Sequence, residues 1–366
     1  MHKKFDIKEF AIIPPPYGGV SVFVKRLIYQ LSQDGYKVGG YYISDVSQSK
    51  IYDSILFDEW SWIETLKFPF KVWKYLKDIY KYQIVHSHFS LEGMIYLWTF
   101  KTICRKKIVV TVHNSMVANY LHNTNLINRF FLKQMFKSNV QWIAVSEQTK
   151  QELENLPLII KNPIHVIPAY IPDLTTNYDE LSSSFLDYLN QHKQNIAFYG
   201  HSFMTNGTTD VYGFYTVIES YFELLKRRES LGLVICLSDT QEKDKIQELH
   251  KLAKKYNLDN QIYWQIGPLD NMKKLWERVH IYFRPTSTDG DSVAVREALD
   301  EGVVVVASDS AFRPKGVIQY KYGSLEDAVE KLLFALDLPK REAAPNMKYY
   351  EEMKSIYDNL LSCRKQ

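Results

Sequence analysis

Short apolar runs alternate with helical patterns along the first half of the chain. After Gly18 and Gly19, apolar side chains recur at spacings of three and four residues, which is typical of a helix buried on one face. Strands that alternate with helices form βαβ units, so this half predicts a parallel sheet with helices on both faces. The strands are expected at residues 10–13, 38–43, 83–86, 107–113 and 141–145.

The alternation restarts after a polar stretch over residues 170–184. The second half therefore predicts another α/β domain, joined to the first by a linker. A last helix is expected at 347–361, after Pro345. The strands of this half are expected at 195–199, 231–237, 261–266, 280–283 and 303–307, and the helices between them at 214–228, 241–255, 272–278 and 292–301.

The composition excludes several classes of protein. The 366 residues are 46% apolar and 24% charged, which is ordinary for a globular chain. The three cysteines lack CxxC spacing, which argues against a disulfide framework and a structural zinc site and fits a reducing cytoplasm. The N-terminus does not resemble a signal peptide, and the longest apolar run, near 94–100, is far below the ~18 residues of a membrane span.

The net charge of +3 is unevenly distributed. Residues 1–170 hold 21 Lys and Arg against 13 Asp and Glu, which gives +8, whereas residues 171–366 hold 24 against 29, which gives −5. This asymmetry predicts that the first half binds something anionic, such as nucleic acid, an acidic membrane surface or a phosphorylated substrate.

Familiar catalytic motifs are missing from the sequence. It contains no GxxxxGK[ST] phosphate loop, no GxGxxG after a strand and no HExxH, and Gly200 lacks the partner glycine of a nucleophile elbow. A P-loop NTPase, a common dehydrogenase, a zinc protease and a serine hydrolase are therefore not expected.

Loops after predicted strands carry the candidate chemistry of the first half. Gly18 and Gly19 precede a long helix, where backbone N–H groups could face a ligand or simply form a tight turn. His113 ends a very apolar strand, and ligands of open α/β sheets lie beyond the carboxyl ends of strands. A merely structural hydrogen bond is the alternative for His113. His86 and His88 end a neighbouring run and are supporting candidates.

In the second half, the segment 284–298 links a strand to a helix that begins near Ser292. Its N–H groups could hold a phosphate, while Asp289 and Glu297 accept hydrogen bonds from sugar hydroxyls. Asp289 and Asp291 also match the DxD spacing of a divalent-metal clamp, but a capped helix is the better-supported interpretation and no metal is expected. The loop after Gly200 is a second phosphate-facing candidate.

Together these segments resemble glycosyltransferase family 4. The resemblance rests on Gly18-Gly19 and its helix, the strand with His86 and His88, TVH at 111–113, IAVSE at 143–147, VIP at 166–168, and DGDSVAVREAL at 289–299 followed by VVVVASD at 303–309. It implies the α/β GT-B fold, with two facing Rossmann-like domains and a last helix that crosses back to the first. On this basis the domains are residues 1–172 with 346–366, which bind the acceptor, and 191–345, which bind a nucleotide-sugar, with a linker at 173–190.

The resemblance also implies a retaining, hexosyltransferase-type enzyme that needs no metal or other cofactor and works in the cleft between the domains. Glu297 would hold the donor ribose, Asp289 would contact sugar hydroxyls in place of the family's first E-x7-E glutamate, and His113 would touch the sugar or a nearby phosphate. The family's basic pair falls near His201 and Tyr212, so the helix start and an arginine are expected to replace it. The predicted donor-binding residues are Gly18, Gly19, Gly200, His201, Tyr212, Arg284, Gly290, Asp291, Ser292, Val293 and Arg296.

Basic residues mixed with large aromatic residues predict a peripheral contact with an anionic membrane at its cytoplasmic face. The alternative is an ordinary helix with aromatic residues in the core and lysines in water. A lipid-linked saccharide acceptor of surface polysaccharide biosynthesis would follow. Further basic runs occur at 101–107 and 129–137, and the main predicted surface comprises Trp62, Lys67, Lys71, Trp73 and Lys74.

Three rival functions stay open. A non-catalytic GT-B binding subunit, or a partner of an active transferase, is favoured by the missing basic pair. A nucleotide-sugar epimerase is disfavoured by the basic face, and a nucleic-acid binder by the absence of a recognised nucleic-acid module.

Overall fold

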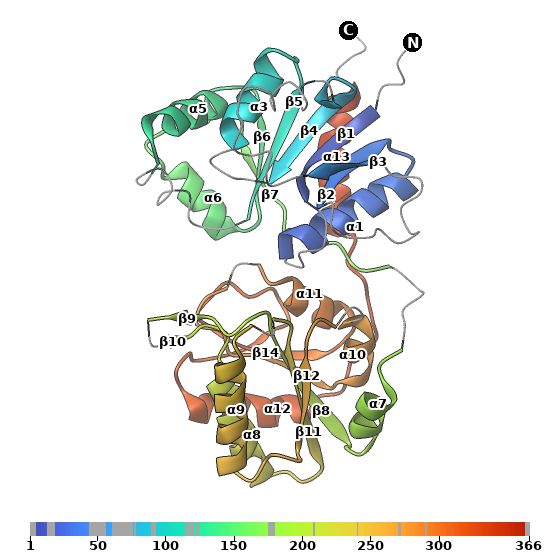
Figure 1. Cartoon of the computed structure of the whole chain (residues 1–366), viewed down its shortest axis with the longest axis vertical. Coiled ribbons are helices and arrows are strands. Elements are labelled where there is room, and N and C mark those ends of the chain that lie inside the picture. Colours follow the sequence, from blue (N-terminus) through green and yellow to red (C-terminus); the bar gives the residue numbers. More distant parts are fainter. Residues whose placement is uncertain are drawn as a thin grey trace. The chain divides into compact units, whose positions relative to one another are not determined.

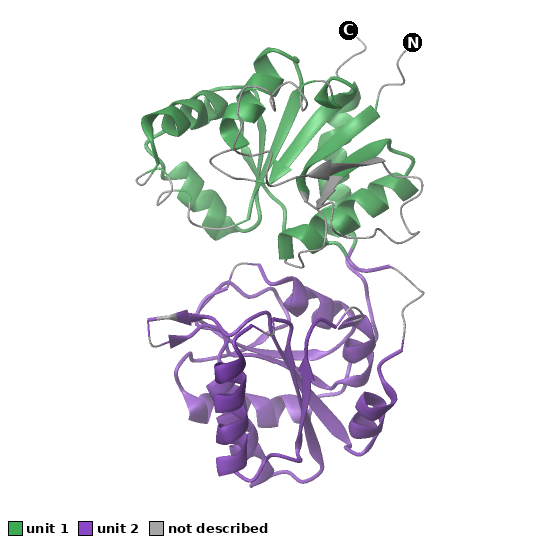
Figure 2. Cartoon of the chain, in the orientation of Figure 1, with its two compact units in different colours: residues 1–171, 347–366 green, residues 172–346 purple. Residues whose placement is uncertain are grey.

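The computed structural model describes residues 5–12, 19–43, 56–60, 76, 78–88, 93–113, 117, 121, 124–174, 180–207, 209–239, 241–269, 272–289 and 291–362. The chain divides into two compact units (Figure 2). Unit 1 comprises residues 1–171 and 347–366, and unit 2 comprises residues 172–346.

Unit 1 is built on a parallel sheet of seven strands in the order β3-β2-β1-β4-β5-β6-β7 (Figure 1). The strands are β1 Phe5–Ile12, β2 Val38–Ile43, β3 Leu56–Trp60, β4 Tyr82–His88, β5 Lys107–Val112, β6 Gln141–Ala144 and β7 Ile164–Val166. The helices are α1 Gly19–Gln33, α3 Gly93–Thr102, α5 Leu126–Phe136, α6 Glu147–Glu154 and α13 Lys348–Ser362.

The two faces of this sheet bury alternate residues of each strand, as the period of two requires. Val85 and Val110 point to the face that packs with α3 and α5. Ile84 and Val109, one position earlier, point to the face that packs with α1 and α13. The C-terminal helix α13 is therefore part of the core of unit 1, as the sequence resemblance implied.

Unit 2 contains a parallel sheet of six strands in the order β12-β11-β8-β13-β14-β15, and a separate two-stranded hairpin, β9 with β10. The strands are β8 Gln194–Gly200, β9 Thr205–Asn206, β10 Thr209–Asp210, β11 Leu231–Leu237, β12 Ile262–Ile266, β13 Ile281–Arg284, β14 Val304–Ser308 and β15 Ile318–Tyr320. The helices are α7 Ser183–Asn190, α8 Phe214–Leu225, α9 Lys243–Lys255, α10 Met272–Arg278, α11 Val293–Asp300 and α12 Leu325–Leu336. Both domains are thus α/β with parallel sheets, as the sequence pattern predicted.

Two local features differ from the sequence expectation. β1 begins at Phe5, not at residue 10, and buries Lys8 and Glu9 completely because internal partners compensate their charges. The stretch 173–190, expected to be a linker, contains α7, whose Phe185 and Leu189 are buried in unit 2.

Candidate active site

Three neighbouring strands of unit 1 change from apolar to polar on one face as they approach their carboxyl ends. The parallel register places Glu9 beside His86, and His88 beside Thr111. Because side chains two residues apart share a face, the polar groups gather above the apolar ones. On this face Ile7 is followed by Glu9, Ile84 by His86 and His88, and Val109 by Thr111 and His113.

Glu9 is the centre of this group. Its carboxylate accepts hydrogen bonds from His86 Nδ1 at 3.0–3.1 Å, from His88 Nε2 at 3.3 Å and from the Tyr357 hydroxyl of α13 at 3.3 Å. His86 Nε2 lies 2.8 Å from the Thr111 hydroxyl. Burial of Glu9 acts to raise the pKa of its carboxyl, but the charge on His86 and the hydrogen bonds from both histidines lower that pKa to about 2.

His113, the candidate named from the sequence, is the outer end of the same group. His113 Nε2 lies 2.7 Å from His88 Nδ1. The Phe23 ring of α1 packs edge-on against both imidazoles, with centroids 5.9 Å from each. Burial lowers the pKa of His88 to about 4 and, with the nearby histidines, lowers the pKa of His113 well below its usual value. Both rings are therefore neutral at pH 7.

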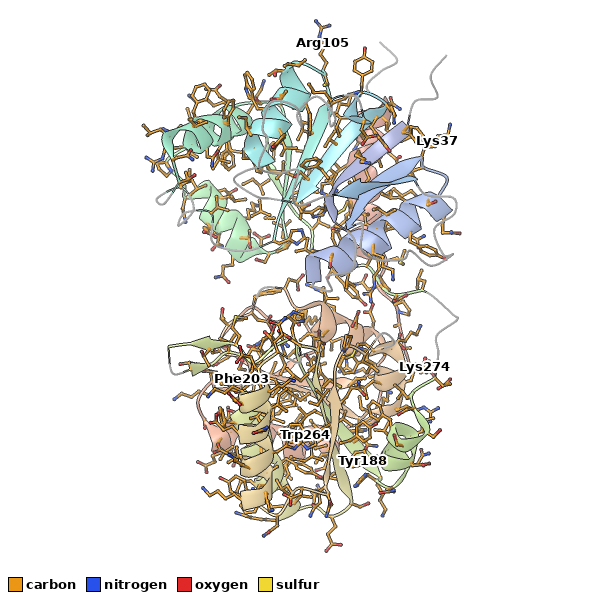
Figure 3. The ribbon with its side chains drawn as sticks, in the orientation of Figure 1. Lys37, Arg105, Tyr188, Phe203, Trp264 and Lys274 are labelled. Carbon is orange, nitrogen blue, oxygen red and sulfur yellow. The ribbon has the colours of Figure 1, made fainter. Side chains whose placement is uncertain are left out.

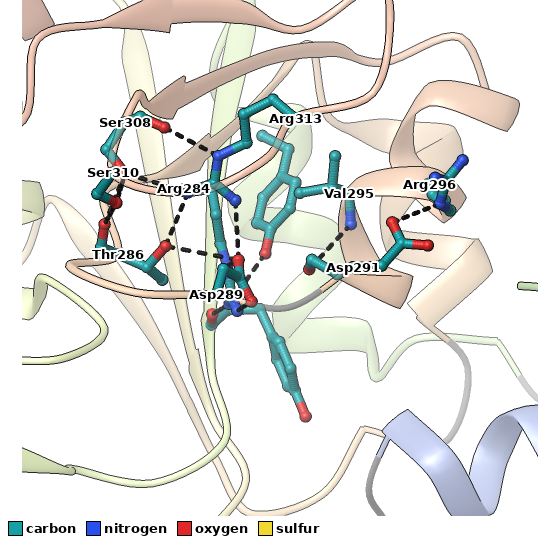
Figure 4. Close-up of polar contacts among 12 residues, drawn as sticks. Arg284, Thr286, Asp289, Asp291, Val295, Arg296, Ser308, Ser310 and Arg313 are labelled. Atoms are coloured by element: carbon teal, nitrogen blue, oxygen red, sulfur yellow. Dashed lines mark hydrogen bonds and ion pairs between the residues drawn. The ribbon is translucent and has the colours of Figure 1, made fainter. Parts of the chain in front are cut away.

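In unit 2 the corresponding group surrounds Asp289, in the loop after β13 (Figure 4). Arg284 donates to both carboxylate oxygens, from Nε at 3.0 Å and from Nη2 at 3.2 Å. Arg313, from the loop after β14, donates from Nη1 at 2.8 Å. Burial acts to raise the pKa of Asp289, but the two guanidinium groups lower it. Asp289 is thus an ionised carboxylate held by two buried cations.

These arginines are fixed by further partners. Arg284 Nη1 donates to the Tyr199 carbonyl at 2.9 Å, and the guanidinium lies over the Tyr212 ring, 5.2 Å from its centroid. Arg313 donates to the Ser308 carbonyl at 2.9 Å and to the Thr286 hydroxyl at 2.9 Å. Two cations and one anion leave this cluster with a net positive charge.

Asp289 thus faces two arginines in the structure, and its contact with sugar hydroxyls stays a prediction. Sequence reasoning missed Arg313. The signal that could have found it is that β13 and β14 are adjacent and parallel, so the loops after them meet at one edge of the sheet.

Asp291 and Arg296, both predicted to bind the donor, form an ion pair at 2.7 Å between Arg296 Nε and Asp291 Oδ1. Burial raises the pKa of Asp291 in spite of this arginine. Ser292 caps α11 by accepting from the Val295 N–H at 3.4 Å, which places Val293 at the first position of the helix. Both carboxylates of the DxD spacing are thus paired with arginines, Asp289 with two and Asp291 with one.

Glu297 lies one turn further along α11 and is partly exposed. Its Oε2 accepts from the Trp276 indole N–H at 3.4 Å. It is the carboxylate that the sequence analysis assigned to the donor ribose.

The second candidate phosphate loop, after β8, is closed by its own carboxylate. Asp210 accepts from the N–H groups of Tyr212 at 3.1 Å, Gly213 at 2.9 Å and Tyr215 at 3.3 Å. These are N–H groups at the start of α8 that a phosphate would otherwise use. The loop expected to receive donor phosphate near Gly200 and Tyr212 therefore already holds the Asp210 carboxyl group, whose pKa is raised by burial in spite of these N–H groups. His201 is exposed in the same loop.

Several predicted residues lie outside the described part of the chain, and no structural statement applies to them. Gly19, in contrast, opens α1 and is exposed. The predicted residues outside the described ranges are Gly18, Gly290, Trp62, Lys67, Lys71, Trp73 and Lys74.

The basic run at 101–107 is largely used within unit 1. Lys101 donates to the Asn139 carbonyl at 2.8 Å, Lys106 to the Tyr80 carbonyl at 2.9 Å, and Lys107 to the Leu360 carbonyl. Arg105 is exposed and extends away from the unit (Figure 3). Only part of this run is therefore presented to an external anion.

Comparison with known proteins supports the resemblance to family 4 over part of the chain and shows the fold. Residues 17–172 match the family model described as Glycosyltransferase Family 4. The sequence search against curated proteins finds no significant match. Among the described helices, none combines the length and apolar character that crossing a membrane requires.

Solved structures resemble the chain over nearly its whole length. Sucrose-phosphate synthase from Thermosynechococcus elongatus has a TM-score of 0.71 at 15% identity, over 98% of this chain and 100% of that one. A glycosyltransferase from Rickettsia africae has a TM-score of 0.71 at 16% identity, over 99% of this chain and 100% of that one. HepE from Anabaena, in complex with UDP and glucose, has a TM-score of 0.66 at 12% identity, over 99% of this chain and 98% of that one. The resemblance to family 4 and the GT-B fold are thereby confirmed.

Proposed function

We propose that this chain, with its Glycosyltransferase Family 4 segment and GT-B fold, transfers a sugar from a nucleoside diphosphate-sugar to a hydroxyl of a saccharide acceptor. The observation that carries the proposal is the placement of polar groups at the carboxyl ends of both sheets. His113 follows β5 in unit 1, and the loop after β13 leads to Glu297 in unit 2.

Each unit would supply a different part of the chemistry. Glu297 accepts hydrogen bonds from the donor ribose. The positively charged cluster of Arg284, Arg313 and Asp289, with the N-terminal end of α11, stabilises the negative charge of the leaving diphosphate electrostatically. His113 contacts the transferred sugar. Retention of anomeric configuration belongs to the proposal through the family, and the anomeric proton coupling of the product measures it.

The donor site is tested with Glu297→Ala. A lost charge-assisted hydrogen bond raises the Kd for a nucleoside diphosphate by about 10- to 150-fold. Calorimetric titration with UDP, the nucleotide bound by HepE, and with other nucleoside diphosphates measures this. Glu301→Ala, at the C-cap of α11 and paired with Lys273, is the control. Unchanged affinity in a folded Glu297→Ala variant would remove Glu297 from the site.

Metal independence is also part of the proposal. Asp289 is held by two arginines and Asp291 by Arg296, so both carboxylates of the DxD spacing already have cationic partners. Turnover is therefore expected to survive excess EDTA. Activity that is lost in EDTA and restored by Mn²⁺ or Mg²⁺ would contradict this.

A second candidate function is a non-catalytic GT-B subunit that supports an active transferase. The observation that favours it is that the Asp210 carboxyl group already accepts from the N–H groups at the start of α8 that a donor phosphate would otherwise use. A screen of nucleotide-sugars for hydrolysis separates the two functions, because a non-catalytic subunit would hydrolyse no donor.

For the acceptor we propose a lipid-linked saccharide of surface polysaccharide biosynthesis, reached from the cytoplasmic face of an anionic membrane. Within the described residues the support comes from α5. Three large apolar side chains are exposed on its outer face, with exposed fractions of 79% for Leu126, 62% for Ile127 and 51% for Phe130. Lys133 and Lys137 continue the same face and are exposed. Apolar side chains next to lysines suit reversible binding to anionic lipid.

Liposome sedimentation tests this surface. Replacing Leu126, Ile127 and Phe130 with Ser is expected to release the protein from anionic vesicles at low salt, and high salt should release the wild type. Ile159→Ser, at an isolated exposed apolar residue of the same unit, is the control. Failure of the wild type to bind anionic vesicles would favour a soluble acceptor.

A further inference from the structure

A continuous line of hydrogen bonds joins the buried carboxylate of Glu9 to the ring of His113. Glu9 Oε2 lies 3.3 Å from His88 Nε2, and His88 Nδ1 lies 2.7 Å from His113 Nε2. The line runs across β1 and β4 to the residue that follows β5. It connects a fully buried anion to the partly exposed histidine of the candidate site.

The position of each proton along this line follows from the chemistry at its buried end. An ionised carboxylate only accepts, so His88 Nε2 must carry a hydrogen. Neutral His88 then has a bare Nδ1, which accepts from His113 Nε2–H. Neutral His113 is left with a bare Nδ1. The lowered pKa of each of the three groups agrees with one anion and two neutral rings.

We propose that Glu9 is a positioning residue that acts through His88 to fix the tautomer of His113, so that His113 Nδ1 accepts a hydrogen bond from a sugar hydroxyl. The ligand part of this inference rests on the proposed function; the tautomer does not. The tautomer decides whether His113 contacts the sugar or a phosphate. A bare ring nitrogen accepts a hydrogen bond from a hydroxyl, but it has no hydrogen to donate to a phosphate oxygen.

The surroundings hold the line in place. Glu9 also accepts from His86 and from Tyr357, so its carboxylate has donors from both β4 and α13. Phe23 packs edge-on against His88 and His113 and restricts the orientation of both rings. The hydrogen bond from His88 to the ionised carboxylate is charge-assisted, which favours this tautomer over the reverse one.

Nitrogen NMR of the full chain labelled with ¹⁵N-histidine tests the tautomer without any need for activity. In the wild type at pH 7, His113 is expected to show a protonated Nε2 and an unprotonated Nδ1. Glu9→Gln removes the anion at nearly constant shape and should convert His113 to a mixture of tautomers. A protonated Nδ1 in the wild type, or an unchanged tautomer in Glu9→Gln, would overturn the relay.

A second variant keeps the test decisive if Glu9→Gln fails to fold. His88→Gln interrupts the line next to His113 and should change its tautomer while Glu9 keeps its other donors. Tyr357→Phe is the matched control, because it removes a donor to Glu9 that lies off the line, and should leave His113 unchanged.

Ligand titrations test the hydroxyl contact. UDP-glucose should shift His113 Nδ1 in the wild type, whereas inorganic phosphate should not, and the reverse result would overturn the assignment. In donor hydrolysis, Glu9→Gln should lower kcat in proportion to the fraction of His113 that leaves the competent tautomer, by about twofold for an equal mixture, with little change in the Kd for UDP. If UDP and UDP-glucose do not bind at all, the proposed function fails, and the NMR of the free protein still decides the tautomer.

Discussion

Glu9, Asp210 and Asp289 are carboxylates that the molecule uses internally, each with a different kind of donor. Glu9 is bound by side chains of β4 and α13, Asp210 by backbone N–H groups of α8, and Asp289 by two arginines. A buried carboxylate without such donors would cost several kcal/mol, so each one fixes the groups around it. The candidate groups of each unit are therefore organised by these residues before any ligand binds.

The buried histidine pair predicts a specific loss of stability in acid. The folded-state pKa of His88, about 4, is below the ordinary 6.5, so the unfolded chain takes up the proton first as the pH falls. The contribution of neutral His88 to the free energy of unfolding is fully present above pH 6.5 and is lost by about pH 4. Glu9, with a pKa of about 2 against 4.5, extends the loss below pH 4.5. Each group accounts for up to about 3 kcal/mol.

Chemical unfolding between pH 7.5 and 4 measures this loss. His88→Gln should flatten the decline between pH 6.5 and 4, because the titrating group is gone. His201→Gln, at an exposed histidine of unit 2, should leave the decline as in the wild type. A wild-type stability that is constant over this range would contradict the assignment.

Arg313→Ala should be strongly destabilising. It removes one of two cations from Asp289 and leaves the Thr286 hydroxyl without its donor. Breaking a buried ion pair from one side costs about 3–5 kcal/mol. Urea unfolding measures the change, and Lys321→Ala, at an exposed lysine of the same unit, should cost less than about 0.5 kcal/mol. Equal effects of the two substitutions would show that the pair adds nothing to stability.

Residues were predictable from sequence where a local rule applied. His113 was found because it ends an apolar strand, and Ser292 because it precedes a helix. Lys8 and Glu9 were left out of the predicted first strand, because two adjacent charges are typical of a solvent-exposed segment. Their burial depends on partners far away in sequence, such as Asp78 and His86. Arg313 was missed for the same reason.

At the scale of elements, some strongly patterned segments were predicted with their observed bounds, whereas very short strands were missed. The strand β11 and the helix α10 have the predicted bounds, because each is a strongly patterned run. The three-residue strands β7 and β15 contain too few residues to show any period. They are fixed by pairing with β6 and β14 at the edges of the sheets.

The turn into α8 allows a test at this scale. Gly213 has φ +82°, and a Cβ added there would lie 2.4 Å from the Pro285 carbonyl oxygen, in the loop after β13. Gly213→Ala should therefore cost about 2–4 kcal/mol, from left-handed strain together with this clash. Gly207, with φ +61° and open space around it, is the matched control, and Gly207→Ala should cost only about 1–2 kcal/mol. Thermal unfolding compares them, and equal costs would exclude the close approach.

At the scale of the whole molecule, unit 1 depends on residues from both ends of the sequence. The helix α13 buries Tyr350, Met353, Ile356 and Tyr357 in this unit. Each large side chain contributes about 1.5–3 kcal/mol on burial, and together they match the stability of a typical domain.

A chain that ends at residue 346 should therefore lose the folded unit 1 and keep unit 2. Calorimetry is expected to show a single cooperative transition, at the position of unit 2 in the full chain. Residues 172–346 expressed alone provide the reference for that transition. A truncated chain that still shows two transitions would mean that α13 is dispensable.

The same return of α13 sets the order of events during synthesis. The last donor to Glu9 is Tyr357. It is synthesised 186 residues after Ile171, where the first segment of unit 1 ends. At about 5–20 residues per second this interval is about 10–40 s. All of unit 2 is synthesised during this interval. Although unit 1 is made first, it is completed last, and a ribosome that stops early releases a chain whose His113 site has not been assembled.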